Sequence, residues 1–400
     1  MVMYSVPGEW IPFFAPLRPA LLTSIFALGP MLFRRFARAE SISVDGTRGK
    51  ALLLFLVWAF ASTIWSVRDD VSLSTAVELF KLVAIYFVVV NVVDTPKRLA
   101  ILCAAWVLAS PVAACGVINW YRLGIDLSEG FRARWIGVYT DPNHMAMNML
   151  VVVPIAVAFI ARKQTPFLLK LGCMAAGGLA VTAMVLSHSR GGFIGLAVAL
   201  AVWALREKRK MQALVVGAVF GVALLVLAPE SFWKRNETVA DFEKDASALG
   251  RVYAWEVASR INMDRPILGV GAGAFKYSWF QYARPEAHRA YVAHDVFLDV
   301  IGELGLVGFF LFLVMVGGCV AGAFEASSAA EHGWIARAVS ASMVGYLLCD
   351  LFSGYLLSAH FFMLMALGAA AQRIALASTE VVPDHRRPAQ MLAGAWGVSR

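Results

Sequence analysis

Three residues whose side chains could bind an anion or move a proton lie near the ends of long apolar segments. They are Arg190 in LSHSRGGFIGL, Arg251 in GRVYAWEVA and His294 in YVAHDVFLDV. A guanidinium can hold a phosphate with two parallel hydrogen bonds. An imidazole, with an ordinary pKa of about 6.5, can accept a proton from a hydroxyl at neutral pH. Together these residue types suit chemistry on an anion that a lipid carries.

Arg190 opens an apolar segment that we expect to be a helix. The free amides and the dipole of a helix N-terminus favour an anion, and Gly191 and Gly192 leave room for a phosphate to approach them. The alternative is an interfacial arginine that reaches lipid headgroups. The residue alone does not decide between the two.

Arg251 and His294 also have two interpretations each. Arg251, with Trp255 one turn further on, could grip a phosphate or could be a solvated charge on an amphipathic helix. His294 stands where a lipid-anchored substrate would present its reactive end, and its alternative role is to cap a helix or to lie at the interface. Asp295 follows it, and an adjacent carboxylate is expected to raise the pKa of the imidazole.

Four ionisable residues fall inside or near apolar segments, where charge is expensive and therefore indicates a function. Asp299 and Glu303 follow His294 along the chain. Glu78 and Lys81 are three residues apart and so share one helix face. Lys81 is expected to lie roughly 10–15 Å below the outer surface, as an anion ligand or as half of a neutralised pair that fixes helix packing.

The sequence YTDPNHMAMNML predicts a turn and a helix cap, with Asp141 or Asn143 accepting hydrogen bonds from free amides. The glycine-rich stretch GVGAGAF at 269–275 lacks a preceding strand and is expected to be a turn, not a nucleotide loop. No metal site is expected, because three further histidines do not have the spacing of metal ligands. They are His144, His188 and His360.

Composition indicates a membrane protein with many spans. Of 400 residues, 60% are hydrophobic and 16% are charged, whereas soluble domains have about 45–50% and about 25%. The net charge of +8 comes from short basic connections, and no nucleic-acid partner is needed to explain it. The five cysteines lie in apolar segments, so neither a disulfide nor a zinc site is expected. The first ten residues have no basic region, so no cleavable signal peptide is expected.

An all-α, polytopic helical bundle follows, because runs that are apolar on every side do not fit barrel strands. A helix needs about 20 apolar residues to cross a bilayer. Eleven candidate spans meet that measure: 11–33, 50–66, 73–93, 98–120, 144–161, 166–186, 190–205, 211–229, 295–323, 334–351 and 354–374.

Basic residues gather in alternate connections, which the positive-inside rule places in the cytoplasm. The other connections, with Arg190, Arg251 and His294, then share the outer face, and the N-terminus lies outside. The ninth connection is a weak exception, with Glu325 and Glu331. The basic set is Arg34, Arg35, Arg38, Arg48, Lys50, Lys97, Arg98, Arg162, Lys163, Lys170, Arg206, Lys208, Arg209, Lys210, Arg373, Arg386 and Arg387.

Four parts follow from this threading: N-terminal spans at 1–229, an outer loop at 230–294, C-terminal spans at 295–378 and a cytoplasmic tail at 379–400. The outer loop is expected to form a helical cap, because ALGRVYAWEVASRIN repeats apolar residues at helical spacing. Ser247 is the expected N-cap of this helix, and Pro266 is expected to end the run.

In this order and on one face, SRGG, GRVYAWEVA with PILGVGAGAF, and AHDVFLDVIGELG resemble the O-antigen ligase and polymerase superfamily. The likeness is densest from about Trp135 to Gly308. It implies a membrane fold related to the GT-C class, with about 11–12 spans, in the bacterial inner membrane. It also implies a metal-independent, inverting glycosyltransferase whose active face is periplasmic. Twelve spans with both ends inside are usual in that superfamily, against the eleven counted here.

The resemblance implies roles for the residues that match its motifs. Arg190 and Arg251 take the places of two arginines that bind donor pyrophosphate, and His294 that of an essential histidine. We add Lys81 as a further anion ligand. The donor is then a glycan on undecaprenyl pyrophosphate, no cofactor is needed, and membrane lipid surrounds the protein. The supporting residues are Glu303, Asp299, Asp141 and Asn143.

Several functions fit this pattern. The leading one is a ligase that attaches a glycan to a lipid A-core acceptor. A polymerase of O-antigen or exopolysaccharide has a second lipid-linked glycan as its acceptor, and a protein O-oligosaccharyl ligase is the third candidate. A lipid-linked glycan flippase or transporter is a different class, in which broken helices, inverted repeats and ionisable groups at midplane are typical. The sequence does not fix the sugar, the linkage or the oligomeric state.

Overall fold

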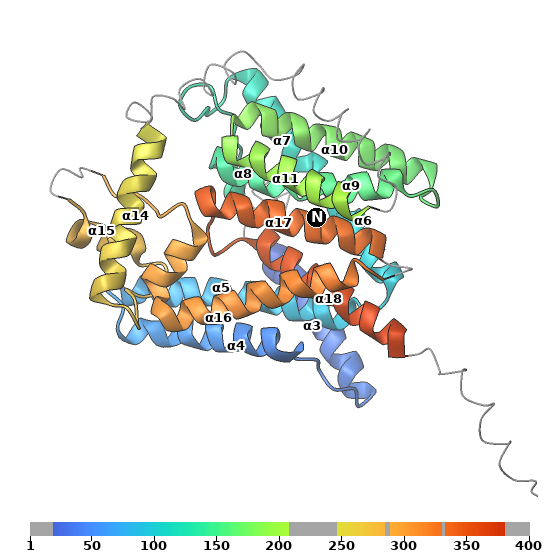
Figure 1. Ribbon diagram of the computed structural model, residues 1–400, viewed down its shortest axis with the longest axis horizontal. Helices are drawn as coiled ribbons and strands as arrows, with labels where there is room; N and C mark the ends of the chain where they lie inside the picture. Colours follow the sequence, from blue (N-terminus) through green and yellow to red (C-terminus); the bar gives the residue numbers. More distant parts are fainter. Residues whose placement is uncertain (1–18, 208–245, 285–288, 330–332, 381–400) are drawn as a thin grey trace, which may run out of the picture.

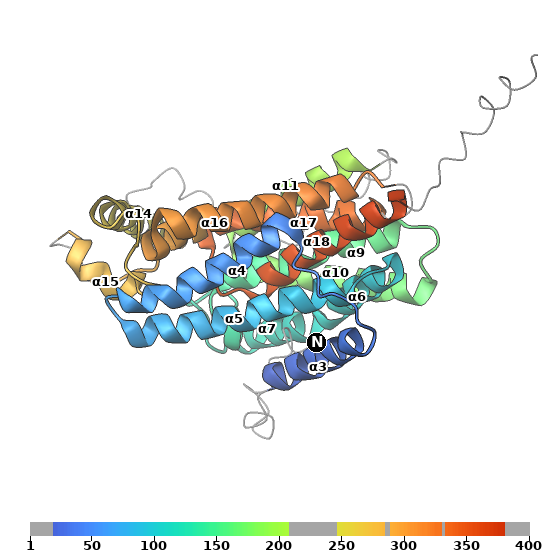
Figure 2. The same ribbon diagram turned by 90° about the horizontal axis from the view of Figure 1, so that it is seen from below.

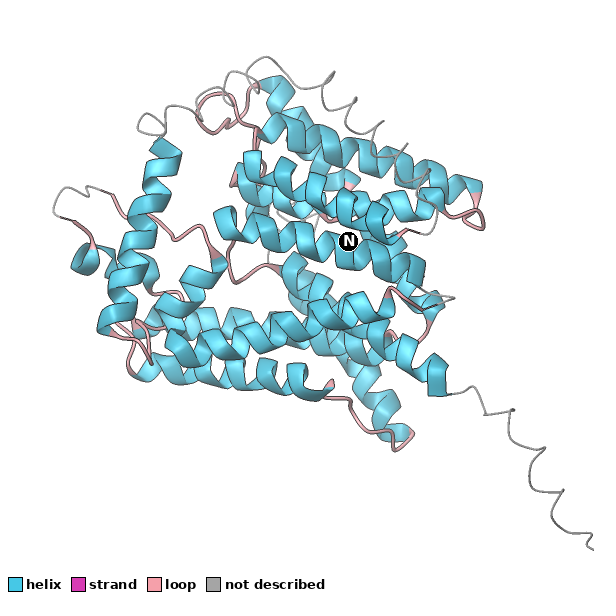
Figure 3. Cartoon of the chain, viewed as in Figure 1, coloured by secondary structure: helices cyan, strands magenta, loops and turns pink. Residues whose placement is uncertain are grey.

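The described part of the chain is α-helical throughout, with loops and no strand (Figure 3). The computed structural model describes residues 19–207, 246–284, 289–329 and 333–380. Within these ranges, eight helical segments are long and apolar enough to cross a membrane, which confirms the prediction of an all-α, multi-pass membrane protein. They are Gly46–Ile64, Asp69–Val92, Pro96–Leu123, Pro142–Ala161, Phe167–Ser187, Val296–Ala326, Gly333–Ser353 and Ala359–Ser378.

Two of the remaining predicted spans correspond to shorter or partly described helices. Helix α11 (Arg190–Arg206) matches the span predicted at 190–205, and α3 (Pro19–Ala37) overlaps the one predicted at 11–33. The span predicted at 211–229 and the tail from 381 lie outside the described residues.

The long helices run side by side in two groups (Figures 1 and 2). Helix α16 packs against α4, α17 and α18, and α18 also packs against α5. In the second group α10 packs against α7, α8 and α9, and α17 joins the groups through its contacts with α11 and α9. The bounds of the first group and of α17 are α4 (Gly46–Ala61), α5 (Asp69–Val92), α16 (Val296–Ala326), α17 (Gly333–Ser353) and α18 (Ala359–Glu380).

Two spans of the second group are broken, where the sequence predicted unbroken spans. Helix α6 ends before Ser110 and α7 begins at Pro111, because proline has no amide proton to continue the helix. Helices α8 and α9 separate at Val151, whose carbonyl accepts a hydrogen bond from Ser342 at 3.0 Å. The bounds are α6 (Pro96–Ala109), α7 (Pro111–Leu123), α8 (Pro142–Leu150), α9 (Val152–Ala161) and α10 (Phe167–Ser187).

Helix α16 has a kink at Gly305 that holds an inserted loop. Gly305 adopts φ 65° and ψ −169°, and a Cβ there would lie 2.1 Å from the carbonyl oxygen of Ile267. The indole of Trp58 donates to the Leu304 carbonyl at 2.8 Å, and the Leu306 amide donates to the Pro266 carbonyl at 2.8 Å. The backbone groups freed by the kink are therefore satisfied by neighbouring parts of the chain.

The inserted loop is the glycine-rich stretch predicted as a turn. Its amides at Val270 and Gly271 donate to the carbonyls of Gly302 and Glu303 at 3.0 and 2.8 Å. Gly271 has φ 101°, and a Cβ at this position would lie 2.2 Å from the Ser66 hydroxyl oxygen. The turn prediction is confirmed, and the loop ties the cap to the spans.

The cap consists of α14 (Ala246–Asp264) and α15 (Phe275–Tyr282), and α14 lies across the ends of the long helices (Figure 1). It has its own apolar core, which includes Ile261, Trp279 and Ala293. The helical cap is thus confirmed, with its end before Pro266. The N-cap prediction is wrong, because α14 begins at Ala246 and Ser247 falls in its first turn.

Connections that the sequence assigned to the outer face meet at one end of the bundle. The Val67 amide donates to the Val270 carbonyl at 3.0 Å, and the Ala133 amide donates to the Leu186 carbonyl at 2.8 Å. The first bond joins the α4–α5 connection to the loop of the cap, and the second joins the loop before α8 to the end of α10. We call this end of the bundle the His294 end.

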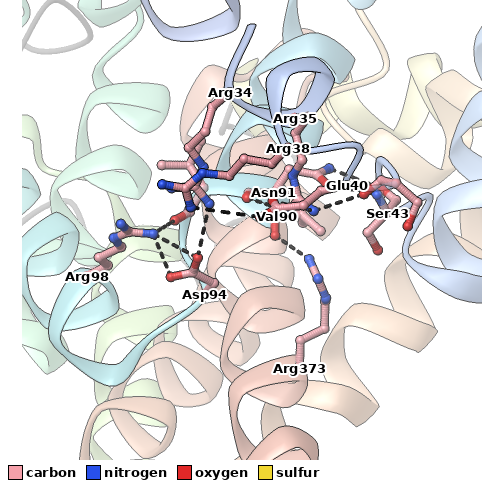
Figure 4. A network of polar contacts seen from close by, with 12 residues as sticks. Arg34, Arg35, Arg38, Glu40, Ser43, Val90, Asn91, Asp94, Arg98 and Arg373 are labelled. Carbon is pink, nitrogen blue, oxygen red and sulfur yellow. Dashed lines mark hydrogen bonds and ion pairs between the residues drawn. The ribbon is translucent and has the colours of Figure 1, made fainter. Parts of the chain in front are cut away.

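Basic residues gather at the opposite end, which we call the Arg98 end (Figure 4). Arg98 donates to both carboxylate oxygens of Asp94 at 2.7 and 2.8 Å, and Arg34 lies 3.6 Å from the same carboxylate. Arg35 donates to the Asn91 carbonyl at 3.1 Å, and Arg373 donates to the Val90 carbonyl. The grouping of these cations at one end agrees with the predicted threading.

Candidate functional site

His294 lies where the cap segment turns into α16. It has φ 53°, in the left-handed region that few residues other than glycine adopt. The carboxylate of Asp295 caps α16, accepting from the amides of Phe297 at 2.8 Å and Leu298 at 3.2 Å. The sharp turn at His294 and the cap at Asp295 together fix the backbone that carries the His294 side chain.

The pKa of His294 is lowered from 6.5 to about 4, chiefly by burial and further by the charges of Arg251 and His144, while Asp141 acts in the opposite direction. The expectation that Asp295 raises this pKa is therefore wrong. Its carboxylate is turned to the α16 amides and does not contribute to the shift. The imidazole of His294 is neutral at pH 7 and can accept a proton.

Asp141 and His144 start α8 beside His294. The Asp141 carboxylate accepts from the amides of Asn143 at 2.7 Å and His144 at 3.2 Å, which confirms the predicted cap. Although burial alone would raise it, the pKa of Asp141 is lowered, by His144, by the two amides and by His294. The His144 ring packs against Tyr355 with centroids 4.2 Å apart and planes tilted by 32°, and it bonds to the Ser353 backbone. The start of α8 thus joins His294 to the loop after α17.

Arg251 is brought to His294 by the packing of α14. A Cβ at Gly250 would lie 2.8 Å from the ring of Tyr291, so glycine permits the close approach of α14 to the segment before His294. Arg251 lies near enough to His294 for its charge to affect the imidazole. The structure therefore brings these two predicted site residues together.

Arg190 is the first residue of α11, as the sequence predicted. The Ser189 hydroxyl caps this helix by accepting from the Gly192 amide at 3.3 Å. A Cβ at Gly191 would meet open space, whereas one at Gly192 would lie 2.7 Å from the Cβ of Ala146. Only Gly191 leaves room for a ligand, and Gly192 is required for α11 to pack against α8. The start of α11, with Arg190, therefore packs against α8, whose first residues include the Asp141 and His144 that act on His294.

Arg132 is a residue of this end that the sequence interpretation missed. Its side chain is 5% exposed and donates to the Ser187 carbonyl at 2.9 Å, to Glu129 at 3.0 Å and to Asn143 Oδ1 at 2.6 Å. It therefore ties the start of α8 to the turn before α11. A single buried arginine in a loop without periodicity gives no sequence signal.

Asp299 and Glu303 lie one turn apart on α16 and both hold the cap. Asp299 bonds to the backbone of Ala293, next to His294. Glu303 is buried and accepts from the amides of Gly273 at 2.6 Å and Phe275 at 3.3 Å. Because both carboxylates bond to backbone groups of the cap segment, both residues position the cap.

Lys81 is not joined to this group by any contact among the described residues. It forms an ion pair with Glu78 at 2.6 Å, and the two side chains are 46% and 55% exposed. The pair therefore lies on the outside of the bundle.

Asp350 was also missed, although it lies one residue before the end of the span predicted at 334–351 and is 1% exposed. The Cys349 thiol next to it donates to the Gly191 carbonyl at 3.1 Å, which joins the end of α17 to the start of α11. The rule that intramembrane carboxylates indicate function could have found Asp350. Among the described residues, no group of three His, Cys, Asp or Glu side chains is placed to hold a metal ion.

Residues 175–313 match the O-antigen ligase family. The chain is 24% identical over 279 residues to a candidate polysaccharide ligase of Rickettsia felis, covering 67% of this chain and 66% of that protein. It is 24% identical over 328 residues to the exopolysaccharide production protein ExoQ of Rhizobium meliloti, covering 72% of this chain and 73% of that protein. A similar candidate ligase from Rickettsia typhi is 23% identical over 297 residues, with 71% of each chain covered.

The fold and these comparisons define a multi-pass membrane protein of the glycosyltransferase type. More particularly, residues 175–313 resemble the O-antigen ligase family, and the predicted resemblance to the O-antigen ligase and polymerase superfamily is confirmed. The matched segment contains Arg190, Arg251 and His294.

Proposed function

We propose that the protein transfers a glycan from undecaprenyl pyrophosphate to an acceptor hydroxyl at the His294 end, as a ligase of the O-antigen type. The observation that carries this proposal is the neutral His294 beside Arg251, inside the segment that matches the ligase family. A neutral imidazole next to a guanidinium suits a reaction that removes a proton while a diphosphate departs.

In the proposed step, the acceptor oxygen attacks the anomeric carbon of the donor sugar. Its proton passes to His294, the new carbon–oxygen bond forms, and the bond from the anomeric carbon to the pyrophosphate oxygen breaks with inversion. Arg251 and Arg190 stabilise the negative charge on the departing pyrophosphate, with Lys81 as a further ligand. The leaving group is already activated, so the scheme needs no nucleotide or metal ion.

We propose that the supporting residues hold the parts of the site in position. Asp141 and Asn143 fix the start of α8, while Asp299 and Glu303 fix the cap against α16. We assign the His294 end to the periplasmic face of the inner membrane, because the opposite end carries the grouped arginines.

The acceptor distinguishes the leading function from a second candidate. Lipid A-core is the acceptor of the ligase that we propose. Similarity to ExoQ favours, as the second candidate, an exopolysaccharide polymerase whose acceptor is another lipid-linked glycan.

The glycan profile of a strain that lacks the gene tests the proposal. Accumulation of long lipid-linked polymer indicates a ligase, whereas loss of everything beyond one repeat indicates a polymerase. An unchanged profile contradicts both. Transfer by the purified protein is expected to survive EDTA, and strict dependence on a divalent cation would contradict the metal-free scheme.

A further inference from the structure

A cavity of about 150 Å³ opens at the Arg98 end, away from the site described above. It lies where α9 and α11 end and α17 begins. A cavity of roughly this volume can hold a molecule of the size of benzene, so it has room for a phosphate group. Its lining residues are Ala158, Ala161, Arg162, Lys163, Gln164, Trp203, Glu207 and Trp334.

The charged groups around this cavity favour an anion. The guanidinium of Arg162 lies 4.5 Å from the ring centroid of Trp334, a stacking contact that leaves its edge for hydrogen bonds. Lys163 is exposed, and neither cation has a carboxylate partner within the described ranges. The one lining carboxylate, Glu207, is paired with Arg337 at 3.2 Å. The cavity wall is therefore positive overall.

A buried indole gives a second and independent observation. Trp203 lines the cavity and is 1% exposed, yet its Nε1 has no hydrogen-bond partner among the described residues. A buried N–H without an acceptor is unfavourable, and native proteins rarely leave one. An acceptor oxygen inside the cavity would satisfy it.

We propose that this cavity binds a phosphate group, which Arg162 and Lys163 hold by charge and which accepts a hydrogen bond from Trp203. The phosphate is that of an anionic phospholipid headgroup or a free phosphate ion, since both present the same oxygens. Ala158 and Ala161 supply an apolar wall that the glycerol part of a phospholipid can contact. The site is separate from the proposed transfer reaction and does not depend on it.

The thermal unfolding of the purified full-length protein in detergent tests this site. The probes are phosphatidylglycerol, inorganic phosphate and diacylglycerol, which has the acyl chains without the phosphate. Phosphatidylglycerol or phosphate is expected to raise Tm saturably, by roughly 5 °C at high excess over Kd, because a ligand stabilises the state that it binds. A rise with phosphatidylglycerol alone assigns a headgroup, and an equal rise with phosphate assigns the free ion. An equal rise with diacylglycerol, or no saturable rise, overturns the proposal.

Matched variants locate the effect. Arg162→Gln with Lys163→Gln is expected to weaken the apparent affinity by about tenfold or more, because two charged donors are lost. Trp203→Phe keeps an aromatic ring but removes the N–H together with part of the indole, and it is expected to weaken affinity by about fivefold. Arg38→Gln with Lys97→Gln removes two exposed cations from the same end and is expected to leave affinity unchanged. Equal affinities in all three variants would show non-specific anion binding and overturn the site.

Discussion

The two ends of the bundle use their buried carboxylates differently. At the Arg98 end, Asp45 pairs with Arg48 at 2.6 Å, and their side chains are 2% and 10% exposed. At the His294 end, Asp295 and Glu303 accept hydrogen bonds from backbone amides and hold a helix start and a loop. These buried carboxylates therefore neutralise a cation at one end and position backbone at the other. Buried carboxylates thus hold a loop and a helix start in place at the His294 end, whereas an ion pair holds helices together at the Arg98 end.

Replacing His294 gives the largest expected effect. His294→Asn is expected to lower the rate of glycan transfer by about 100-fold to 10,000-fold, because the proton acceptor is lost. Asparagine tolerates the left-handed backbone conformation that this position needs, so the loss does not arise from backbone strain. The measurement is transfer by purified protein at equal amounts in the membrane. Activity within a few-fold of the original would remove His294 from the mechanism.

The pH dependence of kcat/KM distinguishes the effects of Arg251 and Asp141 on the pKa of His294. Because the pKa of His294 is about 4, activity is expected to fall only as the pH drops toward that value. Arg251→Gln removes a group that lowers this pKa, so the acid limb moves to higher pH. Asp141→Asn removes a group that raises it and keeps the helix cap, so the limb moves to lower pH.

Arg251→Gln is also expected to reduce kcat/KM about 10-fold to 100-fold, with Arg251→Lys reducing it less, because lysine keeps the charge but not the bidentate geometry. The same comparison applies to Arg190. If both substitutions at both positions left donor use unchanged, the arginines would not bind phosphate. Shifts of the acid limb in the same direction for Arg251→Gln and Asp141→Asn would contradict the assigned electrostatics.

At the Arg98 end, the expected effect is on stability. Arg48→Met leaves the buried Asp45 carboxylate without its cationic partner, with only the Tyr86 hydroxyl still donating to it, and is expected to lower the free energy of unfolding by about 3–5 kcal/mol. Arg48→Met with Asp45→Asn removes both charges and is expected to lower the free energy of unfolding by less than Arg48→Met alone. Transfer per folded molecule should be unchanged in both. A lower Tm with a comparable loss of specific activity would show that the two ends are coupled, against the contrast drawn above.

Sequence patterns were sufficient for features that depend on neighbouring residues. Apolar runs predicted the spans, and local caps predicted Asp141 and the start of α11 at Arg190. Features that depend on distant segments were missed. The buried Arg132 is defined by partners on two other elements, and the pKa of His294 depends on burial and on Asp141 more than on the adjacent Asp295. Folding decides which charges become neighbours, so spacing along the chain could not give them.

Replacing Lys81 gives the smallest expected effect. It also tests whether Lys81 belongs with the arginines of the His294 end. Its ammonium is paired with Glu78 on the outside of α5, so Lys81→Gln is expected to reduce transfer by only about twofold to fivefold. Glu78→Gln with Lys81→Gln then decides the reason for any loss. If the pair only fixes packing, removing both charges restores activity, since no unpaired carboxylate remains. If Lys81 binds the donor, the double variant stays as weak as the single one, and a loss as large as that of Arg251→Gln would place Lys81 with the arginines at the diphosphate.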